Sequence, residues 1–134
     1  MPVRASRPQT PTRGNPLRSV LASLSRGIER AMPIARYLVE GPSMEPAYRD
    51  GERLVVNRYA YRRKRPAIGD VVVLRDPDDS GRYLLKRIAK APDGVDPGPS
   101  RVYVLGDNHN ASRDSREFGL VPRKRIIGRV WFRY

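Results

Sequence analysis

After Leu38 the sequence consists of short apolar runs separated by turns, and this alternation limits the fold more than any other feature. The runs are rich in Val, Ile, Leu, Tyr or Trp and are bounded by Gly, Pro or Asp. Such runs are typical of antiparallel strands, whereas parallel βαβ units would need helical stretches between them. The sequence therefore predicts a mainly β fold, a small antiparallel β-sheet or barrel, with strands at 53–57, 70–75, 83–89, 101–106 and 126–134.

The first 36 residues have a different pattern. Residues 1–15 mix Pro, Arg, Ser and Thr without apolar periodicity, so we interpret them as a disordered basic tail. Residues 16–36 place apolar side chains three and four positions apart, which predicts a short basic amphipathic helix that Pro33 should end. That helix can lie in a membrane interface or pack on its own domain, and both interpretations stay open. At 134 residues the whole chain is long enough for one domain with a single core.

The composition excludes several kinds of site. The chain has no cysteine and one histidine, His109, which excludes disulfides, thiolate nucleophiles, Cys-ligated zinc and multi-His metal centres. Phosphate-loop, HExxH and GxSxG motifs are absent as well. The 27 Lys and Arg residues exceed the 14 Asp and Glu residues by 13, a charge that favours polyanions such as nucleic acid or an anionic membrane. However, 23 of the 27 cations are Arg, a bias that GC-rich coding can also produce.

Two residues are candidates for chemistry. Ser43 stands next to Pro42 and three positions before Pro46, so its loop is stiff, although most loop serines only form turns. Lys86 lies inside a predicted strand, where it shares an apolar face with the residues two positions away on either side. Such a lysine either extends to solvent at an edge or is desolvated, which lowers its pKa and makes it a base. We interpret His109, in a polar loop, as a solvated residue rather than a general base.

Four blocks in the same order and spacing closely resemble the type I signal peptidase family of serine proteases. They are "GPSMEP" (41–46), "GDVVVLRDP" (69–77), "YLLKRI" (83–88) and "GDNHNASRDSR" (106–116). Each block alone is weakly specific, but together they extend the resemblance over about residues 38–133. The resemblance implies that residues 37–134 are a catalytic domain with a Ser/Lys dyad on a mainly β fold. It further implies removal of an N-terminal signal or pro-segment after a small residue, with no metal and no cofactor.

The resemblance also implies roles for single positions. Ser43 matches the nucleophile, Lys86 matches the general base, and Ser112 matches the hydroxyl that orients the lysine. Asp114 and Arg116 match a charged pair that braces the loop beside the site. The turn that sets this loop matches Gly106, Asp107 and Asn108. The candidates for the substrate pocket are Met44, Leu84 and Leu85.

The sequence also departs from the family pattern. Gly41 stands where some members supply a Ser or Thr hydroxyl to the oxyanion hole, so the hole would depend on backbone donors such as the N–H of Ser43. The segment between the Lys86 and Gly106 blocks is too short for the accessory β-domain of some relatives. No run approaches the ~20 apolar residues that span a bilayer, so we expect a peripheral membrane or cytoplasmic protein without a transmembrane helix.

Two alternatives remain open from the sequence. The small size and missing anchor also resemble the soluble proteases that mature nickel-containing superoxide dismutase. LexA-type repressors share a Ser/Lys fold, cleave themselves and bind DNA, which would suit the charge of +13. No helix-turn-helix precedes the predicted catalytic domain, however. We therefore expect an extended peptide substrate with small residues near the cleavage site and keep an anionic membrane surface as a second candidate partner. We do not expect a nucleic acid partner.

Overall fold

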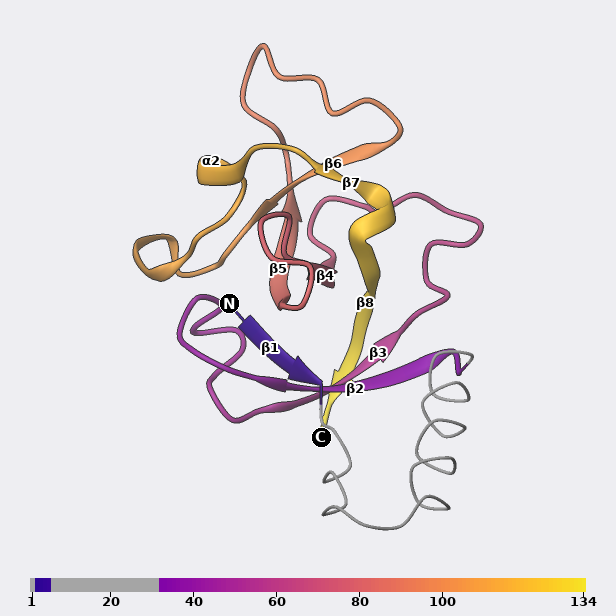
Figure 1. The fold of residues 1–134 in the computed structure, drawn as a ribbon, viewed down its shortest axis with the longest axis vertical. Coiled ribbons are helices and arrows are strands. Elements are labelled where there is room, and N and C mark those ends of the chain that lie inside the picture. The colour runs from indigo at the N-terminus through magenta and orange to yellow at the C-terminus, as the bar shows by residue number, and fades with distance from the viewer. Residues whose placement is uncertain (1, 6–31) are drawn as a thin grey trace.

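Strands make up most of the regular secondary structure in the computed structural model, which describes residues 2–5 and 32–134 (Figure 1). The strands are β1 (Pro2–Ala5), β2 (Ile34–Val39), β3 (Arg53–Asn57), β4 (Val71–Arg75), β5 (Tyr83–Ala89), β6 (Arg101–Leu105), β7 (Val121–Pro122) and β8 (Ile126–Arg133). The helical segments are the 3₁₀ turns η1 (His109–Ala111) and η2 (Arg123–Arg125) and the single-turn helix α2 (Ser115–Phe118).

The strands form an antiparallel sheet that closes on itself. Their order is β1-β2-β3-β8-β4-β5-β6-β7, and β1 pairs with β5 as well as with β2. The first six strands of this order therefore make a closed barrel, which leaves no free edge between them. Strands β6 and β7 continue beyond β5, in the upper part of Figure 1. The predicted small antiparallel barrel is confirmed.

Apolar side chains fill both faces of the central strands. In β4, Val71 and Val73 belong to one buried cluster, while Val72 and Leu74 belong to a second. The apolar residues of the neighbouring strand β5 also alternate between the two clusters, because Leu85 packs in the first cluster and Leu84 and Ile88 pack in the second. Lys86 is an even-numbered residue of β5, so alternation places its side chain on the face of the second cluster.

The predicted strand boundaries agree with the structure to within one residue. The predictions at 53–57 and 83–89 coincide with β3 and β5, and the other three differ by one terminal residue. The agreement follows from the sequence, since β-branched, aromatic and leucine residues dominate these strands and Gly, Pro and Asp bound them. The two-residue strand β7 was not predicted, because so short a segment has no detectable period.

The interpretation of residues 1–15 as a disordered tail is wrong for residues 2–5, which form β1. Four residues are too few to show an apolar period in the sequence. The strand exists because β2 and β5 both present backbone hydrogen-bonding groups to it. Its pairing is therefore determined by tertiary structure and not by local propensity.

The predicted helix at 16–36 is wrong at its C-terminal end, where residues 34–36 begin β2. Ala35, Tyr37 and Val39 are buried and alternate with less buried residues, a period of two that fits a strand. Residues 16–31 of that helix and residues 6–15 of the tail lie outside the described residues. No helix within residues 2–5 and 32–134 is long and apolar enough to cross a membrane.

Candidate active site

Ser43 lies in the loop that follows β2. The loop begins at Gly41, whose φ of +84° is in the left-handed region that favours glycine, and the Gly41 N–H donates to Asp50 Oδ1 at 2.8 Å. Ser43 itself is 3% exposed. Its Oγ is buried and has no hydrogen-bond partner in the described part of the chain. Buried hydroxyls are normally hydrogen-bonded, so this one is unusual among the described residues.

Lys86 lies in the middle of β5 and is 1% exposed, which makes it the largest fully buried side chain among the described residues. Its Nζ donates a hydrogen bond to Ser112 Oγ at 2.8 Å. Burial lowers the pKa of Lys86 below its usual 10.5, and the nearby positive charges of Arg113 and Arg116 act in the same direction, while Asp114 opposes them. The sequence left open whether Lys86 extends to solvent or is desolvated, and the structure shows it desolvated.

Asp114 completes a chain of hydrogen bonds that begins at Lys86. Ser112 Oγ accepts from Lys86 and donates to Asp114 Oδ2 at 3.1 Å, and the Gly106 N–H donates to the same oxygen at 3.0 Å. Arg116 Nε donates to Asp114 Oδ1 at 2.9 Å. Burial alone would raise the pKa of Asp114, but the hydrogen bonds from Arg116 and the Gly106 N–H outweigh it and lower the pKa to about 2. Asp114 is therefore an ionised acceptor that fixes the orientation of the Ser112 hydroxyl.

Gly106 brings the Ser43 loop and Ser112 together. A Cβ on this residue would lie 2.0 Å from Ser112 Oγ and 2.8 Å from the carbonyl oxygen of Ser43, so no side chain fits without movement. The Asn108 N–H donates to that same carbonyl at 2.8 Å, and Asn108 Nδ2 donates to the carbonyl of Pro42 at 3.1 Å. The loop at 106–116 is thus bound directly to the loop that carries Ser43.

Asp107 binds this loop to the strand that carries Lys86. Both of its carboxylate oxygens accept from Arg87, at 2.8 Å each, and Arg87 is the residue after Lys86. The Asp107 N–H also contacts the sulfur of Met44, the residue after Ser43, at 3.3 Å. Ser43, Lys86 and Ser112 therefore belong to three segments that are held together by short-range polar contacts.

Two supports of the site were not predicted from the sequence. Arg113, between Ser112 and Asp114, forms ion pairs with Asp76 and Asp78 in the turn between β4 and β5. Ser115 Oγ accepts from the N–H of Val104 in β6, a buried contact that anchors the start of α2. The charges of the "DPDDS" turn were visible in the sequence. Nothing in the sequence showed which distant arginine would face them.

The three candidates for the substrate pocket lie in the core. Met44 and Leu85 are buried in the first apolar cluster, and Leu84 is buried in the second. Since neighbouring residues of β5 point to opposite faces, Leu84 and Leu85 do not line one common surface. His109 lies at the start of η1, where its ring is exposed and its carbonyl oxygen accepts from Arg116 at 2.8 Å.

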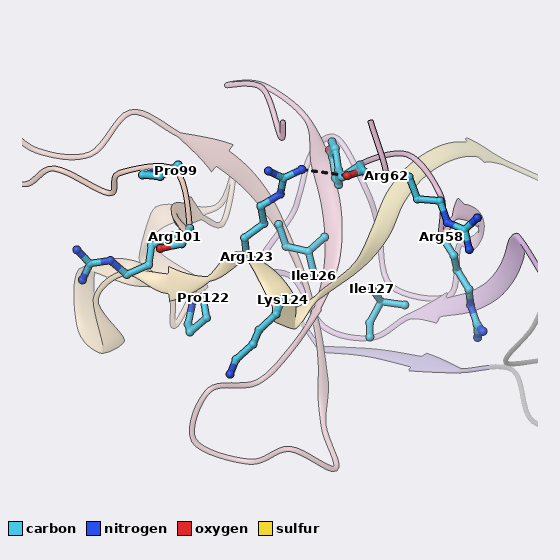
Figure 2. Close-up of a pocket in the computed structure, with 11 residues that line it drawn as sticks. Arg58, Arg62, Pro99, Arg101, Pro122, Arg123, Lys124, Ile126 and Ile127 are labelled. Atoms are coloured by element: carbon cyan, nitrogen blue, oxygen red, sulfur yellow. Dashed lines mark hydrogen bonds between the residues drawn. The ribbon is translucent and has the colours of Figure 1, made fainter. Parts of the chain in front are cut away.

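A separate groove lies away from these residues. This cavity of about 860 Å³ is lined by five cations together with apolar residues and includes none of the candidate site residues. Its lining side chains are drawn in Figure 2. The cations are Arg58, Arg62, Arg101, Arg123 and Lys124. Arg123 is fixed by hydrogen bonds to the carbonyl oxygens of Tyr61 and Lys64, at 2.9 and 2.8 Å. The size of a cavity therefore does not indicate the chemical centre of this protein.

Comparison with known proteins agrees with the resemblance in the sequence. The family described as "Signal peptidase, peptidase S26" matches residues 17–97 and 95–134. Similar proteins include probable signal peptidase I-2 of Synechocystis sp., 29% identical, with 83% of this chain and 67% of that protein covered. Signal peptidase I of Bacillus licheniformis is 32% identical, with 77% of each chain covered. Mitochondrial ATP-independent inner membrane protease subunit 1b of Arabidopsis thaliana is 36% identical, with 69% of this chain and 65% of that protein covered.

These relatives favour neither the dismutase-maturation alternative nor the LexA-type alternative, because they are named signal peptidases and inner membrane proteases. The family match covers well over half of the chain and includes the segments that carry Ser43, Lys86 and Ser112. This chain belongs to the signal peptidase family, peptidase S26, and is a serine-type endopeptidase of the signal peptidase I kind that acts on peptides.

Proposed function

We propose that Ser43 is the nucleophile and Lys86 the general base of this endopeptidase. One observation carries the proposal: Lys86, the only lysine within a strand of the described residues, is buried and donates through Nζ to Ser112 Oγ, in a cluster that also holds Ser43. A serine hydroxyl attacks a peptide only when a base accepts its proton, and a lysine serves as that base only when it is neutral. Desolvation of Lys86 lowers its pKa and therefore favours the neutral form.

The reaction then proceeds in two steps, acylation of Ser43 and deacylation. Lys86 accepts the Ser43 proton as Oγ bonds to the scissile carbonyl carbon, and the carbonyl oxygen becomes an oxyanion near the backbone N–H of Ser43. When the C–N bond breaks, Lys86 returns the proton to the leaving amine, and an acyl ester remains on Ser43. Lys86 next accepts a proton from water as the water oxygen bonds to the ester carbon. When the bond between that carbon and Ser43 Oγ breaks, Lys86 returns the proton to Oγ and the carboxylic acid product leaves.

The burial of Ser43 also supports a preference for small residues before the scissile bond. With Ser43 only 3% exposed, the acyl carbon must approach a confined hydroxyl, and a bulky side chain next to it would collide with the surrounding loops. We therefore propose cleavage after a residue such as Ala, in the course of removing an N-terminal signal or pro-segment. A peptide series with Ala, Val and Leu at that position tests this, and equal kcat/KM for Ala and Leu would contradict it.

The purified full-length chain tests the proposed function directly. It should cleave a synthetic peptide after Ala, and mass spectrometry should find both fragments at the expected masses. A short incubation with an ester substrate should also add the acyl group to the peptide fragment that contains Ser43. An acyl adduct on another residue, or cleavage without any dependence on Ser43, would overturn the assignment.

We also propose that an anionic membrane surface binds this protein. The support is the groove of Figure 2, whose cations come from several segments while Ile126 and Ile127 line it with apolar surface. Each cation near an anionic bilayer contributes on the order of 1 kcal/mol, and salt screens this attraction.

Charge reversal in the groove tests this membrane contact. Arg101→Glu with Lys124→Glu should weaken binding to anionic vesicles by about 30-fold or more at low salt. The matched control is Arg82→Glu with Lys90→Glu, which makes the same change in net charge at exposed positions outside the groove. Equal losses in both double variants would show that net charge alone governs binding. Unchanged binding in the groove variant would contradict the proposal as well.

A further inference from the structure

Strand β1 lies between β2 and β5 and pairs with both (Figure 1). Val3 is opposite Val39 of β2 on one side and opposite Tyr83 of β5 on the other, and Pro2 is opposite Leu84. Without β1, the closed order of strands would open at this one place and expose an edge of β2 and an edge of β5. Two edges separated by one strand lie about 10 Å apart, the width of a single extended chain.

This position is directly beside the candidate active site. The carbonyl oxygen of Pro2 accepts from the Glu40 N–H at 3.0 Å, and a Cβ on Gly41 would lie 3.6 Å from the Pro2 ring. Gly41 precedes Ser43 by two residues, and Leu84, the β5 partner of Pro2, precedes Lys86 by two residues. The N-terminal end of β1 therefore adjoins both segments that carry the proposed dyad.

The edges that β1 covers are suited to one kind of ligand. Buried N–H and C=O groups on two facing strand edges need a partner, and only an extended peptide satisfies both edges at once. The same ligand class is the substrate of this endopeptidase. We infer that residues 2–5 occupy the slot in which an extended peptide substrate binds, and that a substrate displaces β1 before cleavage. This inference rests on the proposed function and adds a form of self-inhibition to it.

The contacts of β1 suit a replaceable occupant. It has four residues, fewer than any other strand of the barrel, and it includes a proline that lacks an N–H to donate. Val3 anchors it, with 4% exposure in the first apolar cluster. Short terminal strands with few buried contacts open at a lower free energy than core strands do. A tethered occupant of this kind competes with substrate at an effective concentration set by its linker.

A weakened anchor should favour the substrate. In the full-length chain, Val3→Ala should lower KM for a peptide substrate at least about threefold with kcat unchanged, since the fraction of molecules with a vacant slot rises. The matched control is Val102→Ala in β6, which makes the same change at a similarly buried position in the other cluster. It should lower the melting temperature but leave KM unaltered. An unchanged KM in Val3→Ala, or an equal fall in both variants, would overturn the inference.

Amide hydrogen exchange tests displacement without a mutation in β1. In full-length Ser43→Ala, which should bind peptide without cleaving it, saturating substrate should speed exchange at residues 3–5 at least about tenfold. Exchange in β3 and β8 should not change. Unaltered protection of residues 3–5 at saturating peptide would overturn the inference, even if the wild-type enzyme is active. Faster exchange in a chain that proves inactive would instead support the slot and reject the proposed dyad.

Discussion

At the scale of single residues, a buried amine and a buried carboxylate lie on either side of one hydroxyl. Lys86 donates to Ser112 Oγ, which donates in turn to Asp114, and Arg116 neutralises the carboxylate from the other side. The amine is thus surrounded by groups that orient it without a direct ion pair. Burial of the amine lowers its pKa, which is consistent with its proposed role as a base.

The dependence of the rate on pH tests that role. Because only neutral Lys86 accepts the Ser43 proton, kcat/KM should rise with pH through the pKa of Lys86 and reach its plateau on the alkaline side. Burial lowers that pKa, so the midpoint of the increase in kcat/KM should lie below pH 10.5. Initial rates measured between pH 5 and pH 10 with one peptide give the profile. An optimum on the acid side would indicate carboxylate chemistry instead.

The stability of the folded protein should report the same pKa. Between the lowered folded-state pKa of Lys86 and its usual 10.5, the unfolded chain binds a proton that the folded chain does not. The free energy of unfolding should therefore rise with pH across that window. Lys86→Met should remove this slope and raise the melting temperature at pH 7, as measured by denaturant and thermal unfolding. A lower melting temperature in Lys86→Met at pH 7 would show that the buried amine is stabilising.

At the scale of elements, the site depends on how closely the loop at 106–116 approaches the Ser43 loop. Gly106 permits that approach, because a Cβ would collide with Ser112 and with a backbone oxygen. Asp107 and Asn108 then bind the loop to β5 and to the Ser43 loop. These contacts join the segments that carry Ser43, Lys86 and Ser112.

Gly106→Ala should therefore impair both stability and catalysis. Overpacking of this kind costs typically about 1–3 kcal/mol of stability, and displacement of Ser112 should lower kcat at least about tenfold. Gly128→Ala is the matched control for stability, since its Cβ would lie 2.4 Å from the Asn57 carbonyl oxygen, in β8 and outside the candidate site. Gly81→Ala has room for its Cβ and should change neither property. Unchanged kcat in folded Gly106→Ala would contradict the proposed role of this close approach.

The strands of the central sheet could be predicted from sequence because their pattern is local. A run such as "VVVLR" has the same β preference wherever it packs, and β4 and β5 were found to within a residue. Strand β1 could not be found in this way, since its pairing with β5 depends on residues 80 positions away. The ion pairs of Arg113 with Asp76 and Asp78 were missed for the same reason. The grouping of Ser43, Lys86 and Ser112 came from family resemblance, and their local patterns alone would not have grouped them.

At the scale of the whole molecule, two buried carboxylates make the stability of the fold depend on pH. Asp76 and Asp114 are almost fully buried, each paired with an arginine of the loop that carries Ser112. Burial alone would raise both pKa values, but the hydrogen bonds from Arg113 and Arg116 outweigh it and lower them. The stabilisation from each carboxylate is therefore present above the unfolded-state pKa near 3.8 and is lost as pH falls through the folded-state value.

Acid unfolding should reveal this link. The shift of the Asp114 pKa from 3.8 to about 2 corresponds to about 2 kcal/mol of stability, which should disappear between about pH 4 and pH 2. Asp114→Asn should unfold more readily at pH 7 and show a shallower loss of stability across that range. Chemical denaturation at several pH values gives both quantities. Equal stability of Asp114→Asn and wild type at pH 7 would contradict the stabilising role of this carboxylate.

The central claim is that Ser43 and Lys86 act together on a peptide, and one set of cleavage rates tests it most directly. Ser43→Ala and Lys86→Ala should each lower kcat at least about 10³-fold without unfolding the chain, and the double variant should be no slower than either single variant. Lys86→Arg should be equally inactive, because a guanidinium stays protonated. His109→Ala is the control and should keep most of the activity. Full activity in Ser43→Ala, or additive losses in the double variant, would contradict the dyad.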